Sequence, residues 1–120
     1  MYNLKGKNVL VTGGAGFVGS NVVKVLIEKH EAKVTVLDDL FSGNIQHLKD
    51  LDVELVRGSV ENAELVSQVI AGKQVVFHLA ARNIIVSNKN PREDLFVNVV
   101  GSFNVFDASL KNNVDRVVYT

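Results

Sequence analysis

The sequence predicts an α/β protein with a doubly wound parallel sheet (a Rossmann arrangement) of about five strands. Two observations lead to this fold class. Short apolar, β-prone runs alternate along the chain of 120 residues with segments whose apolar residues recur at helical spacing. A glycine-rich turn joins the first run to the first helical segment. Such alternation gives parallel strands with right-handed crossovers. We expect the strand order 3-2-1-4-5, which reverses direction between strands 1 and 4.

The expected strands are short and mostly apolar. They span residues 7–12, 33–37, 53–57, 74–80 and 114–119. The fourth run, QVVFHLA, is too apolar for a sheet edge, so we place it at the centre of the sheet. His78 lies within this run, and we interpret it as a core histidine with hydrogen-bond partners rather than as a catalytic group.

The expected helices fill the gaps between the strands. Apolar stripes predict helices over residues 20–29, 61–71 and 92–112, and a short helix over 45–50 that Ser42 or Asn44 could cap. Residues 82–91 are expected to form a loop. The apolar triplet at residues 84–86 (IIV) has three alternative locations, namely the core, the wall of a substrate pocket or an interface. Asn98 falls among apolar positions of the longest helix, so its amide needs partners, either as a clamp at a strand end or as a cofactor contact.

The stretch VLVTGGAGFVGSN at residues 9–21 indicates a diphosphate site. Gly14, Gly16 and Gly19 fit the pattern G-x-G-x-x-G, and Gly13 with the last two fits G-x-x-G-x-x-G. Glycine permits a tight turn and lets an anion approach the backbone. The first N–H groups of the following helix are unpaired and carry the positive end of its dipole. Such a pattern alone is weak evidence, but the strand before it and the helix after it favour dinucleotide binding.

An acidic residue supports the same interpretation. Asp38 lies nineteen residues after Gly19, at the end of the second strand, where a carboxylate can bind both hydroxyls of an adenosine ribose. Asp39 follows it, and the alternative for both acids is a solvated turn or a helix cap. Two acids would repel a 2′-phosphate, and no Arg or Lys follows within the next few residues. The sequence therefore favours NAD over NADP.

Five residues at or just past the expected strand ends should meet at one edge of the sheet. They are Gly16, Asp38, Gly58, Ala80 and Thr120. In an open α/β sheet, ligands bind beyond the carboxyl ends of the strands, at the point where the strand order reverses. This convergence supports a single binding crevice.

The composition narrows the class of protein. Thirteen Lys and Arg balance thirteen Asp and Glu, so bulk charge gives no indication of a nucleic-acid or membrane partner. Cysteine is absent, which excludes a disulfide framework, a thiolate metal site and a cysteine nucleophile. No apolar run reaches the length of a membrane span, and the N-terminal MYNLKGK lacks a signal-peptide core. We expect a cytoplasmic protein with no metal site.

Four segments together resemble the extended short-chain dehydrogenase/reductase family. They are TGGAGFVGSN, the strand-end LDDL, HLAA after strand 4, and NPREDLFVNVVGSFNVFDAS. The greatest similarity is to NAD-dependent epimerases and dehydratases that act on nucleotide sugars, of the UDP-glucose 4-epimerase type. The resemblance covers the whole chain and implies NAD as the cofactor.

The resemblance also implies roles for individual residues. The diphosphate loop comprises Gly13, Gly16 and Gly19, and backbone N–H groups for the phosphates come from Phe17 and Val18. The adenosine ribose is bound by Asp38, surrounded by Asp39, Leu40, Ser42 and Gly43. The adenine is bordered by Ser59 and Val60. Leu79, Ala80 and Ala81 line the nicotinamide-side ribose and the diphosphate. Asn98 ties the long helix to strand 4 and to the cofactor. In one departure, Ser59 stands where the family usually has Asp, so the side chain can accept a hydrogen bond from the adenine amino group but brings no charge.

The family's acid–base residues do not occur in these 120 residues. The resemblance implies a Tyr-x-x-x-Lys pair, but neither Tyr2 nor Tyr119 is followed by Lys at that spacing, and Thr120 aligns with the first hydroxyl after strand 5. We therefore expect a truncated NAD-binding domain over 1–120 with no catalytic residue, whose full-length parent would take a nucleotide sugar. A homodimer through the 92–112 helix is also implied. The alternatives are a non-catalytic dinucleotide-binding or redox-sensing module, and a structural domain of the same fold.

Overall fold

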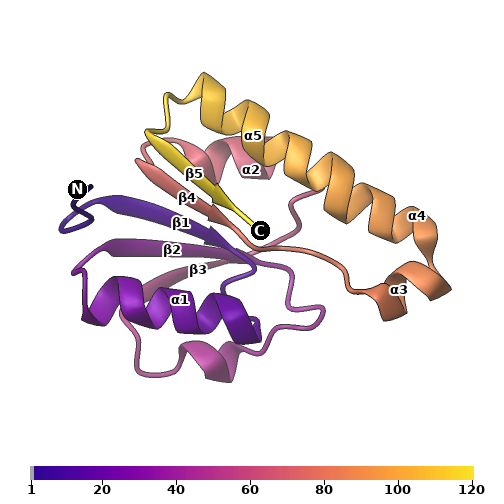
Figure 1. The fold of residues 1–120 in the computed structure, drawn as a ribbon, viewed down its shortest axis with the longest axis horizontal. Helices are drawn as coiled ribbons and strands as arrows, with labels where there is room; N and C mark the ends of the chain where they lie inside the picture. Colours follow the sequence, from indigo (N-terminus) through magenta and orange to yellow (C-terminus); the bar gives the residue numbers. More distant parts are fainter. Residues whose placement is uncertain (1) are drawn as a thin grey trace.

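The computed structural model describes residues 2–120, which form one five-stranded sheet flanked by helices (Figure 1). The strands are β1 (Asn8–Thr12), β2 (Lys33–Asp38), β3 (Val53–Arg57), β4 (Val75–His78) and β5 (Arg116–Tyr119). Their order is β3-β2-β1-β4-β5, and every pair is parallel. The predicted fold class and strand order are confirmed, as is the central position of β4 between β1 and β5.

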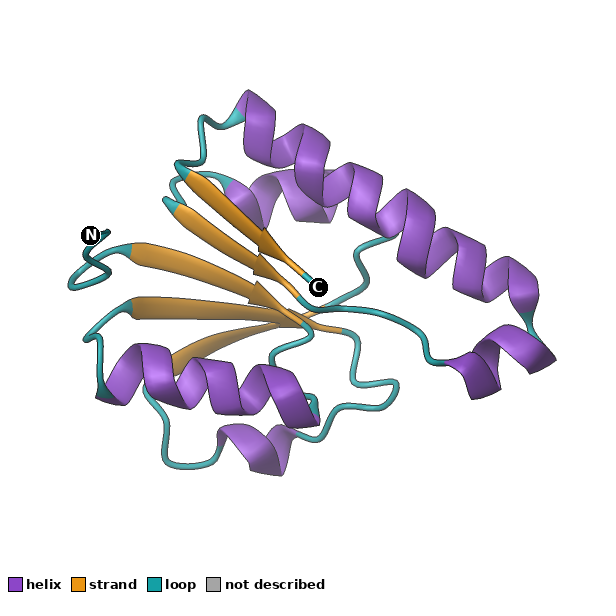
Figure 2. Ribbon diagram, viewed as in Figure 1, coloured by secondary structure: helices purple, strands orange, loops and turns teal. Residues whose placement is uncertain are grey.

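Helices cover both faces of the sheet. The helix α1 (Phe17–Glu28) and the 3₁₀ helix η1 (Ile45–Leu48) lie on one face, while α2 (Ala63–Ile70) and α5 (Gly101–Lys111) lie on the other (Figure 2). Asn44 caps η1 by accepting a hydrogen bond from the backbone N–H of Gln46. The predicted long helix exists as a continuous run of α4 (Pro91–Asp94), the π-helical η2 (Leu95–Val100) and α5.

The segment 82–91 differs from the expected loop because it contains the short helix α3 (Ile84–Lys89). Asn83 starts this helix by accepting hydrogen bonds from the backbone N–H groups of Ile85 and Val86. Six residues are too few to show an apolar stripe, so periodicity gives no signal for α3. Ile84 and Ile85 are 75% and 61% exposed, which excludes the core from the three alternatives for this triplet.

The core has two layers, one on each face of the sheet. Val9 and Val11 of β1 pack toward α1, and Leu10 between them packs toward α2 and α5, as the alternation of side chains along a strand requires. Because helices cover both faces of β1, only its two end residues are polar. The same helices hold the crossover connections on either side of β1. The strand ends that carry the candidate site are therefore held from both faces.

The long helix and the last strand present apolar side chains to solvent. Phe103 is 65% exposed and Leu110 79% exposed on α5, and the side chains of β5 at the sheet edge are exposed along its length. Within residues 2–120, no helix combines the length and the apolar character that crossing a membrane requires.

Candidate functional site

The carboxyl ends of the strands meet at one edge of the sheet, and a cavity of about 60 Å³ lies there. In Figure 1 the arrowheads of all strands point toward this edge, and the chain ends beside it. The cavity is lined by Gly13, Leu37, Asp38, Asp39, Gly58, Ser59, Val60, Leu79, Ala80, Ala81, Arg82 and Val97. Drug-sized ligand pockets typically measure about 300–1,000 Å³, so a dinucleotide would lie mostly in the open crevice above it.

The glycine turn has no room for a Cβ at its two tightest points. Gly13 has φ +71°, in the left-handed region, and a Cβ there would lie 2.8 Å from the backbone nitrogen of Ala80. A Cβ on Gly19 would overlap the carbonyl oxygen of Gly13. The turn is thus packed against both the end of β4 and the first turn of α1, and it leaves a side-chain-free surface between them.

The first turn of α1 opens onto the same edge. Gly16 is the N-cap of this helix and supplies no side chain to cap it. The side chains of Phe17 and Val18 point outward and are 81% and 62% exposed. The unpaired N–H groups of this turn can therefore receive an anion.

Asp38 is held in a fixed orientation at the end of β2. It is 7% exposed. One carboxylate oxygen accepts a hydrogen bond from the backbone N–H of Ala15 (2.9 Å), and the other accepts one from that of Leu40 (2.8 Å). Each oxygen keeps a second acceptor position. The glycine turn and the acid are therefore joined directly, and the carboxylate can still accept two ribose hydroxyls.

The loop after β2 folds back onto the glycine turn. The carbonyl oxygen of Ala15 accepts a hydrogen bond from the backbone N–H of Asn44 (3.0 Å) and lies 2.7 Å from Nδ1 of His47. A Cβ on Gly43 would lie 3.0 Å from a carboxylate oxygen of Asp38. Ser42, in the same loop, is exposed. The predicted ribose-side residues therefore lie together around Asp38.

Ser59 and Val60 lie at the end of β3. The Ser59 hydroxyl donates to Glu61 Oε2 (3.1 Å) and accepts from the backbone N–H of Glu61 (3.2 Å). The side chain of Val60 is buried, and its carbonyl oxygen accepts a hydrogen bond from Nδ2 of Asn104 (2.9 Å). An adenine contact to the Ser59 hydroxyl would therefore compete with Glu61.

A buried hydrogen-bond chain runs behind the cavity. The Oγ1 atom of Thr12 accepts from the backbone N–H groups of Leu79 (3.0 Å) and Ala80 (3.1 Å), so its own hydrogen is directed to Nδ1 of His78 (2.7 Å). Nε2–H of His78 then donates to Ser102 Oγ (2.9 Å). These partners assign the neutral Nε2–H tautomer. His78 is fully buried, and this desolvation lowers its pKa to about 4. The interpretation as a satisfied core histidine is confirmed.

Asn98 acts as a clamp at the end of β4. Its Oδ1 accepts a hydrogen bond from the backbone N–H of Arg82 (2.7 Å), and its Nδ2 donates to the carbonyl oxygen of Arg82 (3.1 Å) and to Asp94 Oδ1 (2.6 Å). The structure shows Asn98 as a strand-end clamp, and its contact with the cofactor stays a prediction. It fixes the backbone at the point where β4 gives way to α3.

Arg82 is a site residue that the sequence reasoning missed. Its guanidinium forms ion pairs with Asp39 (2.6 Å) and Glu93 (2.8 Å), and its Cζ lies 4.1 Å from the centre of the Phe41 ring. Burial opposes the charge on Arg82, but hydrogen bonds to Asp39 and Glu93 outweigh it and raise the pKa of the guanidinium. Arg82 lies 43 positions after Asp39, outside the few residues in which a cation would be expected from sequence. An Arg directly after HLAA, at the same sheet edge, was the available signal.

The structure brings most of the predicted site residues together. Eight line the cavity, namely Gly13, Asp38, Asp39, Ser59, Val60, Leu79, Ala80 and Ala81. Of the others, the α1 end supplies Gly16, Phe17, Val18 and Gly19, the β2 loop supplies Leu40, Ser42 and Gly43, and Asn98 braces the end of β4. The side chains of Phe17 and Val18 line a separate apolar pocket with Leu4 and Phe77. Among residues 2–120, the structure shows no group of three or more His, Cys, Asp or Glu side chains that could hold a metal ion.

Comparison with known proteins identifies the family. Residues 9–120 match the model of the NAD dependent epimerase/dehydratase family. The chain belongs to this family. The chain is 40% identical over 111 residues to a dTDP-glucose 4,6-dehydratase of Mycobacterium tuberculosis, covering 88% of this chain and 34% of that protein.

Solved structures show the same family fold. An epimerase of Methanothermobacter thermautotrophicus superposes with a TM-score of 0.91 at 39% identity, covering 97% of this chain and 35% of that one. The UDP-glucose 4-epimerase of Thermus thermophilus, solved in complex with NAD, superposes with a TM-score of 0.83 at 32% identity, covering 92% of this chain and 36% of that one. The chain thus spans about a third of the length of these relatives.

Proposed function

We propose that this chain binds NAD as the cofactor-binding part of a nucleotide-sugar epimerase or dehydratase. One observation carries the proposal: the side-chain-free turn at Gly13 and Gly19 is hydrogen-bonded, through Ala15, to the carboxylate of Asp38. A diphosphate needs the turn and an adenosine ribose needs the acid, and both lie on one edge of the sheet. The relative solved with NAD has the same fold at 32% identity.

The residues present fit a dinucleotide. The first N–H groups of α1 would bind the diphosphate, since Gly16 leaves this helix end uncapped. Asp38 would accept the ribose hydroxyls, and Ala80 and Ala81 would allow the cofactor to pass close to the end of β4. Bound NAD supplies a nicotinamide ring that accepts and returns a hydride. The chain's own residues bind and orient the cofactor, and we assign no catalytic residue within 1–120.

Titration calorimetry with NAD tests the cofactor proposal. The wild-type chain should bind NAD at one site. The Gly19→Ala variant should lose at least about tenfold in affinity, because its Cβ would displace the Gly13 carbonyl and the phosphate-binding backbone. Lys24→Ala removes an exposed side chain from the same helix and is the matched control, which should bind as the wild type does. Absence of NAD binding by a folded wild-type chain would overturn the proposal.

We extend the proposal to the whole protein. Its substrate would be a nucleotide sugar, as the names of the dTDP-glucose dehydratase and UDP-glucose epimerase relatives suggest. Incubation of the whole protein with UDP-glucose and with dTDP-glucose, followed by chromatography of the products, tests this. Turnover of neither sugar nucleotide, nor of their N-acetylated counterparts, would count against it.

We also propose a homodimer through the 92–112 helix and a cytoplasmic location. The dimer is supported by the exposed apolar side chains along this helix, among them Val99 (58% exposed), Phe103 (65%) and Leu110 (79%). The location is supported by the lack of cysteine. Sedimentation equilibrium tests the homodimer, and cell fractionation tests the cytoplasmic location.

A further inference from the structure

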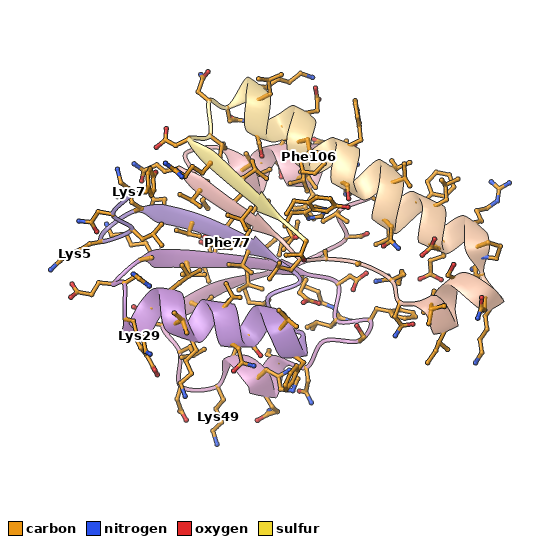
Figure 3. The ribbon with its side chains drawn as sticks, in the orientation of Figure 1. Lys5, Lys7, Lys29, Lys49, Phe77 and Phe106 are labelled. Atoms are coloured by element: carbon orange, nitrogen blue, oxygen red, sulfur yellow. The ribbon has the colours of Figure 1, made fainter. Side chains whose placement is uncertain are left out.

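The wall of the cavity contains a cation beside the ribose-side acids. Among residues 2–120, Arg82 is the one Lys or Arg side chain in that wall, and Asp38 and Asp39 face it from the end of β2. Figure 3 shows Lys5, Lys7 and Lys29 projecting at the opposite end of the sheet. This cation comes from the segment between β4 and α3, whereas a residue that binds a 2′-phosphate commonly lies near the end of β2.

Asp39 holds this cation in place. The contact between Arg82 Nη2 and Asp39 Oδ2 is 2.6 Å, and the Arg82 side chain is only 10% exposed, so solvent screens the pair weakly. Glu93 binds Nε from the other side, and Phe41 covers one face of the guanidinium. With two carboxylates bound to it, Arg82 contributes no net positive charge to the cavity.

We infer that Arg82 is a latent 2′-phosphate-binding cation and that its ion pair with Asp39 makes the site prefer NAD to NADP. The inference rests on the proposed NAD-binding function and deepens it. Asp39 acts in two ways. Its own charge repels a 2′-phosphate, and it occupies the guanidinium edge that would otherwise receive the phosphate oxygens. Removal of this acid therefore does more than relieve a repulsion.

The two effects of Asp39 can be separated by a double-mutant cycle. The variants are Asp39→Ser, Arg82→Met and the double variant, and each is titrated with NAD and with NADP. A serine hydroxyl can still accept the hydrogen bond that Asp39 Oδ1 now takes from the backbone N–H of Phe41. Methionine keeps much of the length and apolar stem of Arg82 but has no charge.

The inference predicts that Asp39→Ser raises NADP affinity at least about tenfold, as expected for a hydrogen bond between charged groups. In the Arg82→Met background the same substitution should raise NADP affinity less than about threefold, since only the relief of repulsion remains. NAD affinity should change less than NADP affinity in every variant. Asp52→Ser removes an exposed acid far from the cavity and should leave the NAD-to-NADP ratio unchanged.

Equal gains in NADP affinity with and without Arg82 would overturn the inference, because repulsion alone would then explain the preference. No gain in either background would also overturn it. If Asp39→Ser fails to fold, as judged by circular dichroism, the near-isosteric Asp39→Asn replaces it in the same cycle. Failure of the wild-type chain to bind NAD would instead contradict the proposed function, so the two failures are distinguishable.

Discussion

Acid should destabilise this protein through one buried side chain, His78. In the folded chain Nδ1 of His78 accepts the hydroxyl hydrogen of Thr12, whose own acceptor positions are filled by the N–H groups of Leu79 and Ala80. A proton on Nδ1 would face that hydroxyl hydrogen with no acceptor in reach. Desolvation acts in the same direction and lowers the pKa of His78 from 6.5 to about 4.

The size and sign of the effect follow from linkage. Between pH 6.5 and about 4 the unfolded chain binds a proton at His78 that the folded chain does not bind, so stability falls as the pH falls through this window. From pH 7.5 to pH 5 the contribution of His78 is a loss of about 2 kcal/mol. Domains of this kind are stable by about 5–15 kcal/mol, so the loss should lower the urea midpoint by about 1 M.

Urea unfolding at pH 7.5, 6 and 5 measures this loss, and the His78→Gln variant isolates it. The stability difference between wild type and variant should shrink by about 2 kcal/mol between pH 7.5 and pH 5. His30→Gln removes an exposed histidine from the turn before β2 and should follow the wild-type pH dependence. Parallel curves for wild type and His78→Gln would refute the reasoning. If His78→Gln does not fold, ring ¹⁵N shifts report the protonation of Nδ1 directly, and protonation above pH 6 would refute it.

Two further predictions concern the long helix of α4, η2 and α5. Asn98→Ala should lower the free energy of unfolding, measured in urea, by about 1–3 kcal/mol, because the backbone N–H and carbonyl of Arg82 lose their partners. A change below about 0.5 kcal/mol would show that water replaces the clamp. Phe103→Glu should weaken self-association in sedimentation experiments by placing a charge on the exposed apolar face of α5, whereas Lys111→Glu, at the end of that helix, is the charge-changing control. Equal self-association of wild type and Phe103→Glu would place any interface elsewhere.

Much of the site could be predicted because its chemistry is local in sequence. Gly13 and Gly19 stand where a Cβ would strike backbone atoms, and such positions leave a pattern of fixed spacing. Asp38 follows an apolar strand directly, and its hydrogen bonds to Ala15 and Leu40 follow from the position of that strand beside β1. The strand order follows from the alternation of strands and helices and from the handedness of crossovers.

The rest depends on pairings between distant residues. Arg82 meets Asp39 across 43 positions and Glu93 across 11, and no local pattern encodes either contact. The clamp role of Asn98 could not be derived from sequence, since it depends on the backbone of Arg82, 16 positions away. The helix α3 is held by the single cap of Asn83 rather than by an apolar stripe, which is why its segment read as a loop.

The most direct test of the account is the location of the NAD site by amide chemical-shift mapping. Titration of the ¹⁵N-labelled chain with NAD should shift the backbone N–H groups of Phe17, Val18 and Gly19 most strongly, with further shifts at Ala15 and Ala80. These groups surround the uncapped end of α1 and the glycine turn. The account would be contradicted if the largest shifts fell instead at the opposite end of the sheet, around Asn8, Lys33 and Lys73, or if NAD shifted none of the amides.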